Sequence, residues 1–421
     1  MRFSRELLDA SAAALAEVLT FAYPADAMLS HFFREHPKLG RRDRAVIAET
    51  IYAVLRRLRL LSHVSRSDSP RILVLSAWVS LLGANLREVS AYTRRGEDEQ
   101  LAKIKQEVHL PQPFEVECDF PDWLIERLRR RFDDEALLEL ARALHRSAPL
   151  DLRVNLARAT RQDIIARLGA DAIGASATPY SPAGVRIVGN PAINLHPLFR
   201  QGLVEVQDEG SQILCYLVAP RRGEMVVDFC AGAGGKTLAL GMLMRSTGRL
   251  YAFDVSDKRL AQLKPRLARS GLSNVHPQRI QNERDPRLSR LAGKIDRVLV
   301  DAPCTGLGTL RRNPDLKWRR RPEDVEELRA KQATILAGAA RLVKPGGRLV
   351  YATCSLLEEE NRAVVDAFLT ASGEFVLKPV REVLAAERIS LDMGDTLELW
   401  PHRHATDGFF AAVLDRSGKA S

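Results

Sequence analysis

The stretch EMVVDFCAGAGGKT, residues 224–237, decides the fold class of this chain. Its apolar first half predicts a strand, and its second half is a loop that contains Gly232, Gly234 and Gly235. Glycines after a strand let the backbone approach a ligand closely, and the helix that follows directs its N–H groups toward the same place. The stretch therefore indicates the first strand and the ligand loop of a nucleotide-binding α/β domain.

Three ligand classes compete for such a loop. A phosphate-binding loop needs glycine at the position of Cys230, and a dinucleotide fingerprint needs glycine at the position of Thr237, so both patterns fail by one residue. S-adenosylmethionine, the third class, needs a close loop but no pyrophosphate cradle. Asp254 ends the next strand and is placed to hold ribose hydroxyls, which favours an adenosine ligand. A plain turn without a ligand is the alternative.

Strand-like and helical segments alternate from about residue 209 onward. This alternation predicts a parallel, doubly wound sheet that binds ligands at the carboxyl ends of its strands. A small α+β module precedes it, with the strand-like segments LDLRVNL and GVRIVG on either side of a helix. The predicted strands of the large sheet are EMVVDF, RLYAFDV, NVHPQRI, DRVLVDAP, GGRLVYATCS and GFFAAVL.

The first 105 residues are rich in arginine and have helical periodicity. Ile47, Ile51, Val54, Leu55 and Leu58 fall on one face of a helix. The expected domains are a helical domain over 1–105, a linker with the small α+β module over 106–208, and the sheet domain over 209–421.

Composition narrows the class of protein and of partner. The 421 residues carry 63 Lys and Arg against 53 Asp and Glu, a net charge of +10, so an anionic partner is plausible. The sequence contains no run of about 18 apolar residues, so it predicts no membrane-spanning helix. Five scattered cysteines fit a reducing cytoplasm, and no His or Cys cluster predicts a metal site. We expect a cytoplasmic monomer without a metal.

Two cysteines lie where parallel strands end. Cys304 follows the strand RVLV, and Cys354 follows the strand GRLVYA. A lone cysteine is usually a small buried hydrophobic residue, as we expect for Cys118 and Cys215. Two cysteines at the edge that binds the cofactor are harder to explain by packing. Without a zinc cluster or an oxidising compartment, a thiolate nucleophile is the remaining chemical use.

Several motifs together are similar to those of one enzyme family. The segments DFCAGAGGKT (228–237), DAPCTGLGTLRRNPDLKW (301–318) and YATCSLLEEEN (351–361), with VQDEGSQ (206–212) and TDGFFAA (406–412), resemble the Sun/RsmB-type RNA (cytosine-5)-methyltransferases. They cover most of residues 206–414. The helical N-terminus, with LGRRDRAVI and YAVLR, resembles the NusB-like RNA-binding domain of the RsmB branch. The implied fold is a Rossmann-like class I methyltransferase sheet, preceded by the small α+β module and an all-helical NusB-like domain.

The resemblance implies a mechanism and its residues. Cys354 would add to carbon 6 of cytosine as the nucleophile, and Cys304 would assist breakdown of the covalent adduct. Asp301 would hold the edge of the cytosine ring while it faces the cofactor, and Lys236 would lie near both. The base must be unstacked to reach the pocket, which favours single-stranded RNA. The expected cofactor is S-adenosyl-L-methionine, bound by Cys230, Ala231, Gly232, Ala233, Gly234, Gly235, Lys236, Asp254, Asn282 and Asp301.

The chain departs from the family pattern at three places. Gly232 and Ala233 stand where the family usually has Ala and Pro, which loosens the cofactor loop. Asn282 stands where an acidic residue usually contacts the adenine amine, and Asp285 is the fallback for that contact. Thr305 replaces the commoner Ser and keeps the hydroxyl.

Basic residues near the second cysteine motif and in the N-terminal domain are candidates for RNA contact. A solvated basic surface is the alternative for all of them, and Trp318 either stacks on a base or packs. The candidates are Arg311, Arg312, Lys317, Trp318, Arg319, Arg320, Arg41, Arg42 and Arg44.

The sequence therefore predicts an S-adenosylmethionine-dependent RNA 5-methylcytosine methyltransferase. Small-subunit ribosomal RNA is the expected substrate, and this expectation rests only on the resemblance of the N-terminus to the NusB-like domain. The same chemistry on transfer RNA is one alternative. An RNA-binding ribosome assembly factor with a vestigial cofactor site is another.

Overall fold

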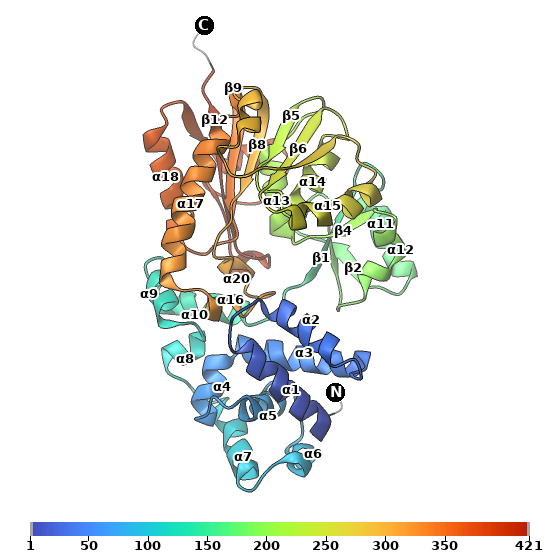
Figure 1. The fold of residues 1–421 in the computed structure, drawn as a ribbon, viewed down its shortest axis with the longest axis vertical. Helices are drawn as coiled ribbons and strands as arrows, with labels where there is room; N and C mark the ends of the chain where they lie inside the picture. Colours follow the sequence, from blue (N-terminus) through green and yellow to red (C-terminus); the bar gives the residue numbers. More distant parts are fainter. Residues whose placement is uncertain (1–2, 419–421) are drawn as a thin grey trace. The chain divides into compact units, whose positions relative to one another are not determined.

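The computed structural model describes residues 3–418 and divides the chain into two compact units (Figure 1). The first unit comprises the chain up to Ser147 together with Thr309–Pro322, and the second comprises Ala148–Gly308 together with the chain from Glu323 onward. The sequence predicted that the helical domain ends at residue 105, whereas the helices up to residue 144 belong to the first unit. The return of 309–322 to that unit was not predicted.

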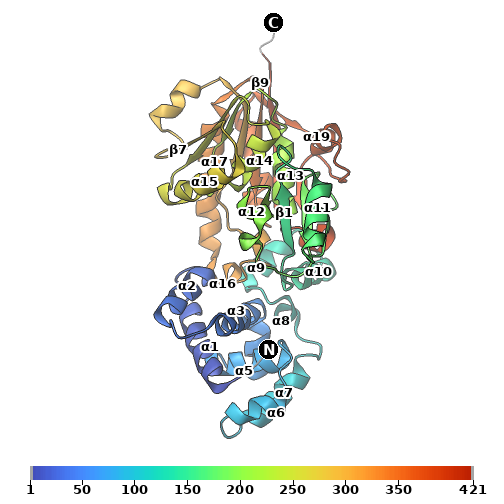
Figure 2. The same ribbon diagram turned by 90° about the vertical axis from the view of Figure 1, so that its right-hand side faces the viewer.

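The first unit is entirely helical, as predicted. Its central helix is α5 (Pro70–Ser80), whose residues Leu73–Val79 are all buried, because α1, α3, α4 and α7 pack around it (Figure 2). The helices of this unit are α1 (Arg5–Val18), α2 (Ala25–Glu35), α3 (Arg41–Arg56), α4 (Leu58–Ser65), α5, α6 (Leu86–Val89), α7 (Glu97–Glu107), α8 (Phe114–Cys118), α9 (Asp122–Leu128), α10 (Asp134–Leu144) and α16 (Leu316–Arg319).

The predicted apolar face of α3 is confirmed. Ile47, Ile51, Val54 and Leu55 are buried in the helical core. Leu58 lies beyond the end of α3 and begins α4, since the backbone of Arg57 leaves the helical conformation.

The second unit begins with the predicted small α+β module. Its four antiparallel strands have the order β2-β3-β1-β4. Helix α11 (Arg161–Ala170) is capped by Thr160, whose side chain accepts a hydrogen bond from the N–H of Asp163. The other elements are β1 (Leu150–Val154), β2 (Ala175–Ala177), β3 (Gly184–Ile187), α12 (Pro197–Arg200) and β4 (Val204–Val206).

The large sheet has the strand order β10-β12-β9-β8-β5-β6-β7. Strands β5 to β9 are parallel, as predicted, and the order reverses at β5, which pairs with β6 on one side and β8 on the other. The last strands correct the prediction of a parallel sheet, because β12 runs antiparallel to β9, β10 and β11. The bounds are β5 (Met225–Asp228), β6 (Arg249–Asp254), β7 (Val275–Arg279), β8 (Ile295–Asp301), β9 (Val343–Thr353), β10 (Phe375–Lys378), β11 (Leu397–Leu399) and β12 (Phe409–Arg416).

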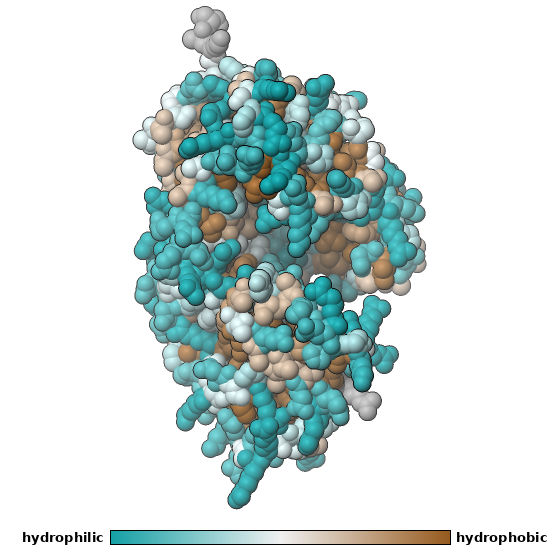
Figure 3. All heavy atoms as spheres, viewed as in Figure 1, coloured by the Kyte–Doolittle hydropathy of each residue, from teal (hydrophilic) through white to brown (hydrophobic). Residues whose placement is uncertain are grey.

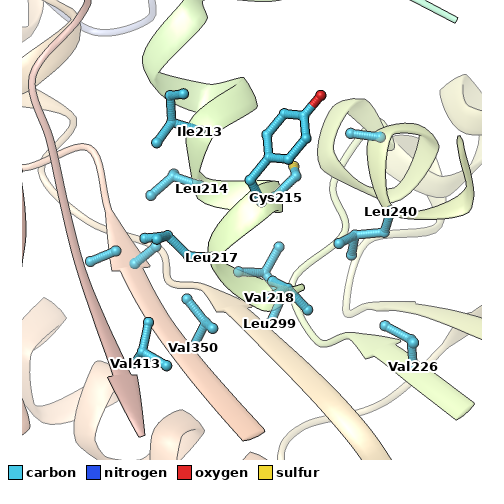
Figure 4. Packing of buried hydrophobic residues seen from close by; sticks show 14 of the residues in the cluster. Ile213, Leu214, Cys215, Leu217, Val218, Val226, Leu240, Leu299, Val350 and Val413 are labelled. Atoms are coloured by element: carbon cyan, nitrogen blue, oxygen red, sulfur yellow. The ribbon is translucent and has the colours of Figure 1, made fainter. Parts of the chain in front are cut away.

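Helices cover both faces of this sheet, because neighbouring strand residues point to opposite faces. Val226 belongs to the core cluster that contains side chains of α13, α14 and α19, whereas Val227 belongs to the cluster with side chains of α17 and α18. Figure 4 shows α13 side chains, among them Leu217 and Val218, lying over the strands. The helices are α13 (Glu209–Val218), α14 (Gly235–Leu243), α15 (Asp257–Ser270), α17 (Pro322–Ala340), α18 (Arg362–Ala371), α19 (Val380–Ala386) and α20 (Pro401–His404). Within residues 3–418, no helix is long and apolar enough to cross a membrane.

Candidate active site

The glycine-rich loop connects β5 to α14, next to the strand where the sheet order reverses. Gly232 and Gly234 have positive φ angles of 56° and 84°, which glycine adopts at little cost. A Cβ atom on Gly234 would lie 2.1 Å from Cδ1 of Leu263, so α15 requires glycine there. A Cβ on Gly232 would meet no atom within 4 Å. The open side of Gly232 is therefore accessible to a ligand.

Three side chains hold this loop in place. Arg266 of α15 donates from Nη1 to the carbonyl oxygen of Ala233 at 2.7 Å, and Arg153 of β1 donates from Nη1 to that of Gly235 at 2.9 Å. The Arg266 guanidinium also pairs with Glu205 of β4 at 3.0 Å. The sequence did not single out these three residues, because no local motif shows that β1, β4 and α15 face the loop. They anchor a loop that the departures at Gly232 and Ala233 were expected to loosen.

Asp228 offers an unpaired acceptor at the base of the loop. Its Oδ2 accepts a hydrogen bond from Thr237 Oγ1 at 2.6 Å, whereas its buried Oδ1 has no partner among the described residues. Burial raises the pKa of Asp228 to about 7, although the Thr237 hydrogen bond opposes this shift. A cationic amine would satisfy the oxygen and stabilise the charged form. This site fits the amino group of S-adenosylmethionine.

Asp254 lies at the end of β6, as predicted, and its carboxylate faces the loop. The N–H of Gly232 donates to its Oδ2, and the N–H of Ser256 donates to its Oδ1, both at 2.8 Å. Each carboxylate oxygen has a second lone pair for a hydroxyl. Its contact with ribose stays a prediction.

The candidates for the adenine contact differ in their surroundings. Asn282 is exposed, and its Oδ1 accepts from the N–H of Arg284 at 2.9 Å. Asp285 is buried and accepts from the N–H of Gln281 at 2.8 Å and from Arg287. The hydrogen bond from Arg287 holds the pKa of Asp285 well below its usual range. Asp285 therefore stabilises its own loop, and Asn282 is the better candidate for adenine.

The two predicted catalytic cysteines lie together. Sγ of Cys304 and Sγ of Cys354 are 3.4 Å apart, at the ends of the neighbouring strands β8 and β9. The hydrogen bond to Cys354, together with burial, raises the pKa of Cys304 well above its ordinary value. A raised pKa favours the neutral thiol form of Cys304. Either sulfur can donate the hydrogen bond between them, and the assignment of Cys354 as the nucleophile stays a prediction.

Lys236 and Asp301 form an ion pair at the same edge. Nζ of Lys236, on the first turn of α14, lies 2.8 Å from Oδ2 of Asp301, the last residue of β8. Burial disfavours the ammonium, but the charge and hydrogen bond of Asp301 outweigh it and raise the pKa of Lys236. The ammonium also lies 5.5 Å from the ring centroid of Phe409. The structure therefore brings both predicted polar residues into one charged cluster.

Three of the family motifs contain further residues that hold the site, for which the sequence predicted no role. Gly308 donates from its N–H to the carbonyl oxygen of Cys354, and Gly408 donates to that of Gly308, both at 2.8 Å. A Cβ on Gly308 would lie 2.1 Å from the carbonyl oxygen of Gly408, so this close approach of the TDGFFAA motif requires glycine at position 308. Glu360 of the YATCSLLEEEN motif is buried beside both cysteine loops. No group of at least three His, Cys, Asp or Glu side chains in residues 3–418 forms a metal site.

The remaining three cysteines are neutral thiols, and two of them, Cys118 and Cys215, have the packing roles expected of them. Cys118 and Cys215 are buried, and burial raises the pKa of each to about 12. Burial also raises the pKa of Cys230 in the cofactor loop well above its ordinary value. All three are therefore neutral thiols.

The segment 309–322 belongs to the helical unit, and its basic residues have internal partners. Nζ of Lys317 is buried and donates to the carbonyl oxygens of Arg56, at 2.9 Å, and Asp119, at 2.5 Å. Trp318 donates from its indole N–H to the carbonyl oxygen of Leu55 at 3.0 Å. Lys317 and Trp318 thus attach the segment to the helices, which differs from the RNA contact predicted for them, because a buried ammonium cannot reach a phosphate without breaking these bonds.

The remaining RNA candidates differ in exposure. Arg311 is buried, whereas Arg312, Arg319 and Arg320 are partly exposed. Arg41 and Arg42, on the first turn of α3, are exposed, while Arg44 is partly exposed and donates to the carbonyl oxygen of Leu39. Figure 3 shows hydrophilic side chains over much of the viewed face of each unit. The exposed arginines of α3 are therefore the best placed of the candidates.

The chain matches known proteins over its length. Residues 215–415 match the family model of the 16S rRNA methyltransferases RsmB/F, and residues 120–194 match the ferredoxin-like domain of RsmF/B-like methyltransferases. A probable ribosomal RNA small subunit methyltransferase B of Synechocystis is 30% identical over 93% of this chain and 95% of that protein. The chain belongs to the RsmB/F methyltransferase family. The predicted family, its Rossmann-like fold and its S-adenosylmethionine-dependent methyltransferase domain are confirmed.

Other relatives agree. Ribosomal RNA small subunit methyltransferase B of Shewanella oneidensis is 35% identical over 70% of this chain and 66% of that protein. Among solved structures, PH0851 is 28% identical and covers 99% of this chain and 100% of that chain, with a TM-score of 0.78. A methyltransferase homologue from Pyrococcus horikoshii is also 28% identical, with a TM-score of 0.62 over 72% of this chain and 97% of that chain.

Proposed function

We propose that this chain methylates carbon 5 of cytosine in RNA through a transient covalent bond between Cys354 and the base. The observation that carries the proposal is the pair of sulfur atoms 3.4 Å apart at the edge that also holds Lys236 and Asp301. A methyltransferase whose substrate atom is a nucleophilic nitrogen or oxygen needs no thiol, because that atom can attack the methyl group directly. A ring carbon that is a poor nucleophile needs a thiolate to activate it first.

The residues supply each step that the ring carbon requires. The Cys354 thiolate bonds to carbon 6, which moves an electron pair onto carbon 5 and makes it nucleophilic. S-adenosylmethionine, when bound, would supply the methyl group to carbon 5; its sulfonium C–S bond would break and S-adenosylhomocysteine would leave as the neutral product. Lys236 and Asp301 hold the edge of the ring that gains electron density. The proton on carbon 5 then passes to a base, the bond to Cys354 breaks, and the aromatic ring is restored. We assign Cys304 to this breakdown.

We propose small-subunit ribosomal RNA as the substrate, because the relatives above are named ribosomal RNA small subunit methyltransferases. The target cytosine must be unstacked, so a loop or another single-stranded segment suits the site. We propose that the protein acts in the cytoplasm as a monomer. The basic first turn of α3 would supply phosphate contacts.

Bisulfite sequencing tests the proposal. A deletion strain should lose one 5-methylcytosine signal in small-subunit ribosomal RNA. The wild-type gene should restore it, and a gene encoding Cys354→Ala should not. An unchanged ribosomal pattern together with a lost transfer RNA signal would move the substrate to transfer RNA. If no signal is lost and the purified protein binds RNA without a cofactor-dependent thermal shift, the assembly-factor alternative is favoured.

A further inference from the structure

We propose that Glu360 is a positioning residue that sets the distance between Cys304 and Cys354. The inference rests on the proposed function, in which both sulfurs act on one base. Glu360 is fully buried. It lies outside the catalytic set predicted from the sequence.

The Glu360 carboxylate accepts hydrogen bonds from both cysteine loops. Its Oε1 accepts from the N–H of Thr305 at 2.8 Å, and its Oε2 accepts from Thr305 Oγ1 at 2.5 Å. The Oε2 atom also accepts from Ser355 Oγ. Thr305 follows Cys304 directly, and Ser355 follows Cys354 directly. A single carboxylate thus joins the residues that succeed the two cysteines.

A third element supports the same carboxylate. Nε2 of Gln332, on α17, donates to Oε1 of Glu360 at 3.0 Å and to the carbonyl oxygen of Pro303 at 2.9 Å. The backbone of Glu360 is held as well, because Tyr351 donates from its hydroxyl to the Glu360 carbonyl oxygen at 2.6 Å. The carboxylate therefore has a fixed position relative to β9, β8 and α17.

These contacts match the capacity of an ionised carboxylate. Four donors, two N–H and two O–H groups, point at its two oxygens, and hydrogen bonds to a charged acceptor are stronger than neutral ones. Removing the carboxylate leaves the N–H of Thr305 without its acceptor. The hydroxyls of Thr305 and Ser355, 3.2 Å apart, then keep each other as partners across the two loops. The loops would then separate or rotate, and the sulfurs would lose the spacing that lets both reach one ring.

The distance between the sulfurs can be read without RNA or cofactor. Phenylarsine oxide binds tightly only where two thiols reach one arsenic atom, with release of water. The wild-type protein should form a one-to-one complex that Cys304→Ala abolishes. Glu360→Ala should weaken this complex at least about tenfold and lower kcat about 100-fold, with little change in KM, since a misplacement of about 1 Å costs that much.

Conservative variants separate positioning from a general loss of structure. Glu360→Gln keeps the shape, and the hydroxyls of Thr305 and Ser355 can rotate to accept from its amide, so it should largely restore arsenical binding. Ser355→Ala removes one donor only and serves if Glu360→Ala does not fold. A cofactor-dependent thermal shift reports the fold of each variant. The matched control is Asp296→Asn, a carboxylate at the other end of β8 that accepts from the N–H of Met225.

The outcomes decide the inference. Loss of arsenical binding and of kcat in Glu360→Ala or Ser355→Ala, with both retained in Asp296→Asn, supports it. Wild-type arsenical affinity in a folded Glu360→Ala, or a lost complex with unchanged kcat, overturns it. If the wild-type protein does not methylate cytosine, the proposed function fails, while the arsenical comparison still decides whether Glu360 sets the spacing.

Discussion

Lys236 and Asp301 form an ion pair between the first turn of α14 and the carboxyl end of β8, with Nζ and Oδ2 2.8 Å apart. A second Lys–Asp pair joins Lys344 of β9 to Asp296, near the other end of β8. The side chain of Lys236 is 12% exposed and that of Lys344 is 46% exposed, whereas Asp301 is 29% exposed and Asp296 is 16% exposed. The two pairs therefore form a matched comparison for chemistry against structure.

Lys236→Met should lower the rate of methyl transfer about 100-fold or more, because it removes a fixed charge from the edge where the ring gains electron density. Lys344→Met should change the rate little, since an exposed pair contributes about 0–1 kcal/mol. Single-turnover transfer of a labelled methyl group measures both. Equal effects of the two variants would count against a role for Lys236 at the reacting base.

Replacement of the two cysteines should separate their roles. Cys304→Ala should accumulate a covalent RNA–protein complex, because the adduct forms but breaks down slowly. Cys354→Ala should form no complex and keep the cofactor-dependent thermal shift. Denaturing gels with labelled RNA detect the adduct. A complex that requires Cys304 and persists in Cys354→Ala would reverse the assignment.

Asp228 should make the cofactor-free protein less stable as the pH rises. Burial raises its pKa from 3.8 to about 7, so the folded state binds more protons than the unfolded state between these values. The free energy of unfolding should therefore fall across this window, by up to about 1.4 kcal/mol per pH unit from this group. Denaturant titrations from pH 4 to pH 8 should show the fall in the wild type and a flatter profile in Asp228→Asn.

The same group should couple pH to cofactor binding. A cationic amine near Oδ1 favours ionised Asp228, so cofactor affinity should increase as the pH rises through about 7. Isothermal titration of the wild type and Asp228→Asn measures the effect. An equally steep increase in both proteins would exclude Asp228 as its source.

Arg266→Met should weaken cofactor binding several-fold and leave RNA affinity unchanged. The variant loses the hydrogen bond to the Ala233 carbonyl oxygen and leaves Glu205 with one cation fewer. The cofactor loop then orders only on binding, which lowers affinity by the cost of ordering. Arg362→Ala, which breaks an exposed pair on α18, is the control. Unchanged cofactor affinity in Arg266→Met would mean that the other anchors suffice.

The salt dependence of RNA affinity should distinguish exposed from buried cations. Each lost phosphate contact lowers the slope of log K against log salt by about 0.9 on duplex and about 0.7 on single-stranded nucleic acid. Arg42→Ala should lower the slope by about that amount, and Lys317→Met should not change it, because the ammonium of Lys317 bonds backbone oxygens in the helical unit. A reduced salt-dependence slope in Lys317→Met would support the RNA contact that the sequence predicted for Lys317.

The sequence by itself determined the fold class and predicted the edge of the sheet where the cysteines lie. Gly232 and Gly234 follow one strand and Asp254 ends the next, a pattern that favours a ligand loop. Parallel strands place Cys304 and Cys354 at one edge whatever their side-chain positions. These inferences rest on local signals, namely backbone freedom and strand direction. The antiparallel direction of β12 lay beyond them, because an isolated strand carries no signal of its partner's direction.

Only the tertiary structure decided how the site is held. Arg266 and Arg153 act on a loop far from them in sequence, and Glu360 joins the nearby Ser355 to the distant Thr305. Neither spacing nor composition shows which carbonyl or hydroxyl such a side chain contacts. The same holds for Lys317, which reads as a surface cation beside a catalytic motif but is buried among backbone oxygens. The local sequence pattern shows which segments form strands, helices and loops and which residues carry charge. Burial and hydrogen bonding depend instead on which distant elements pack together.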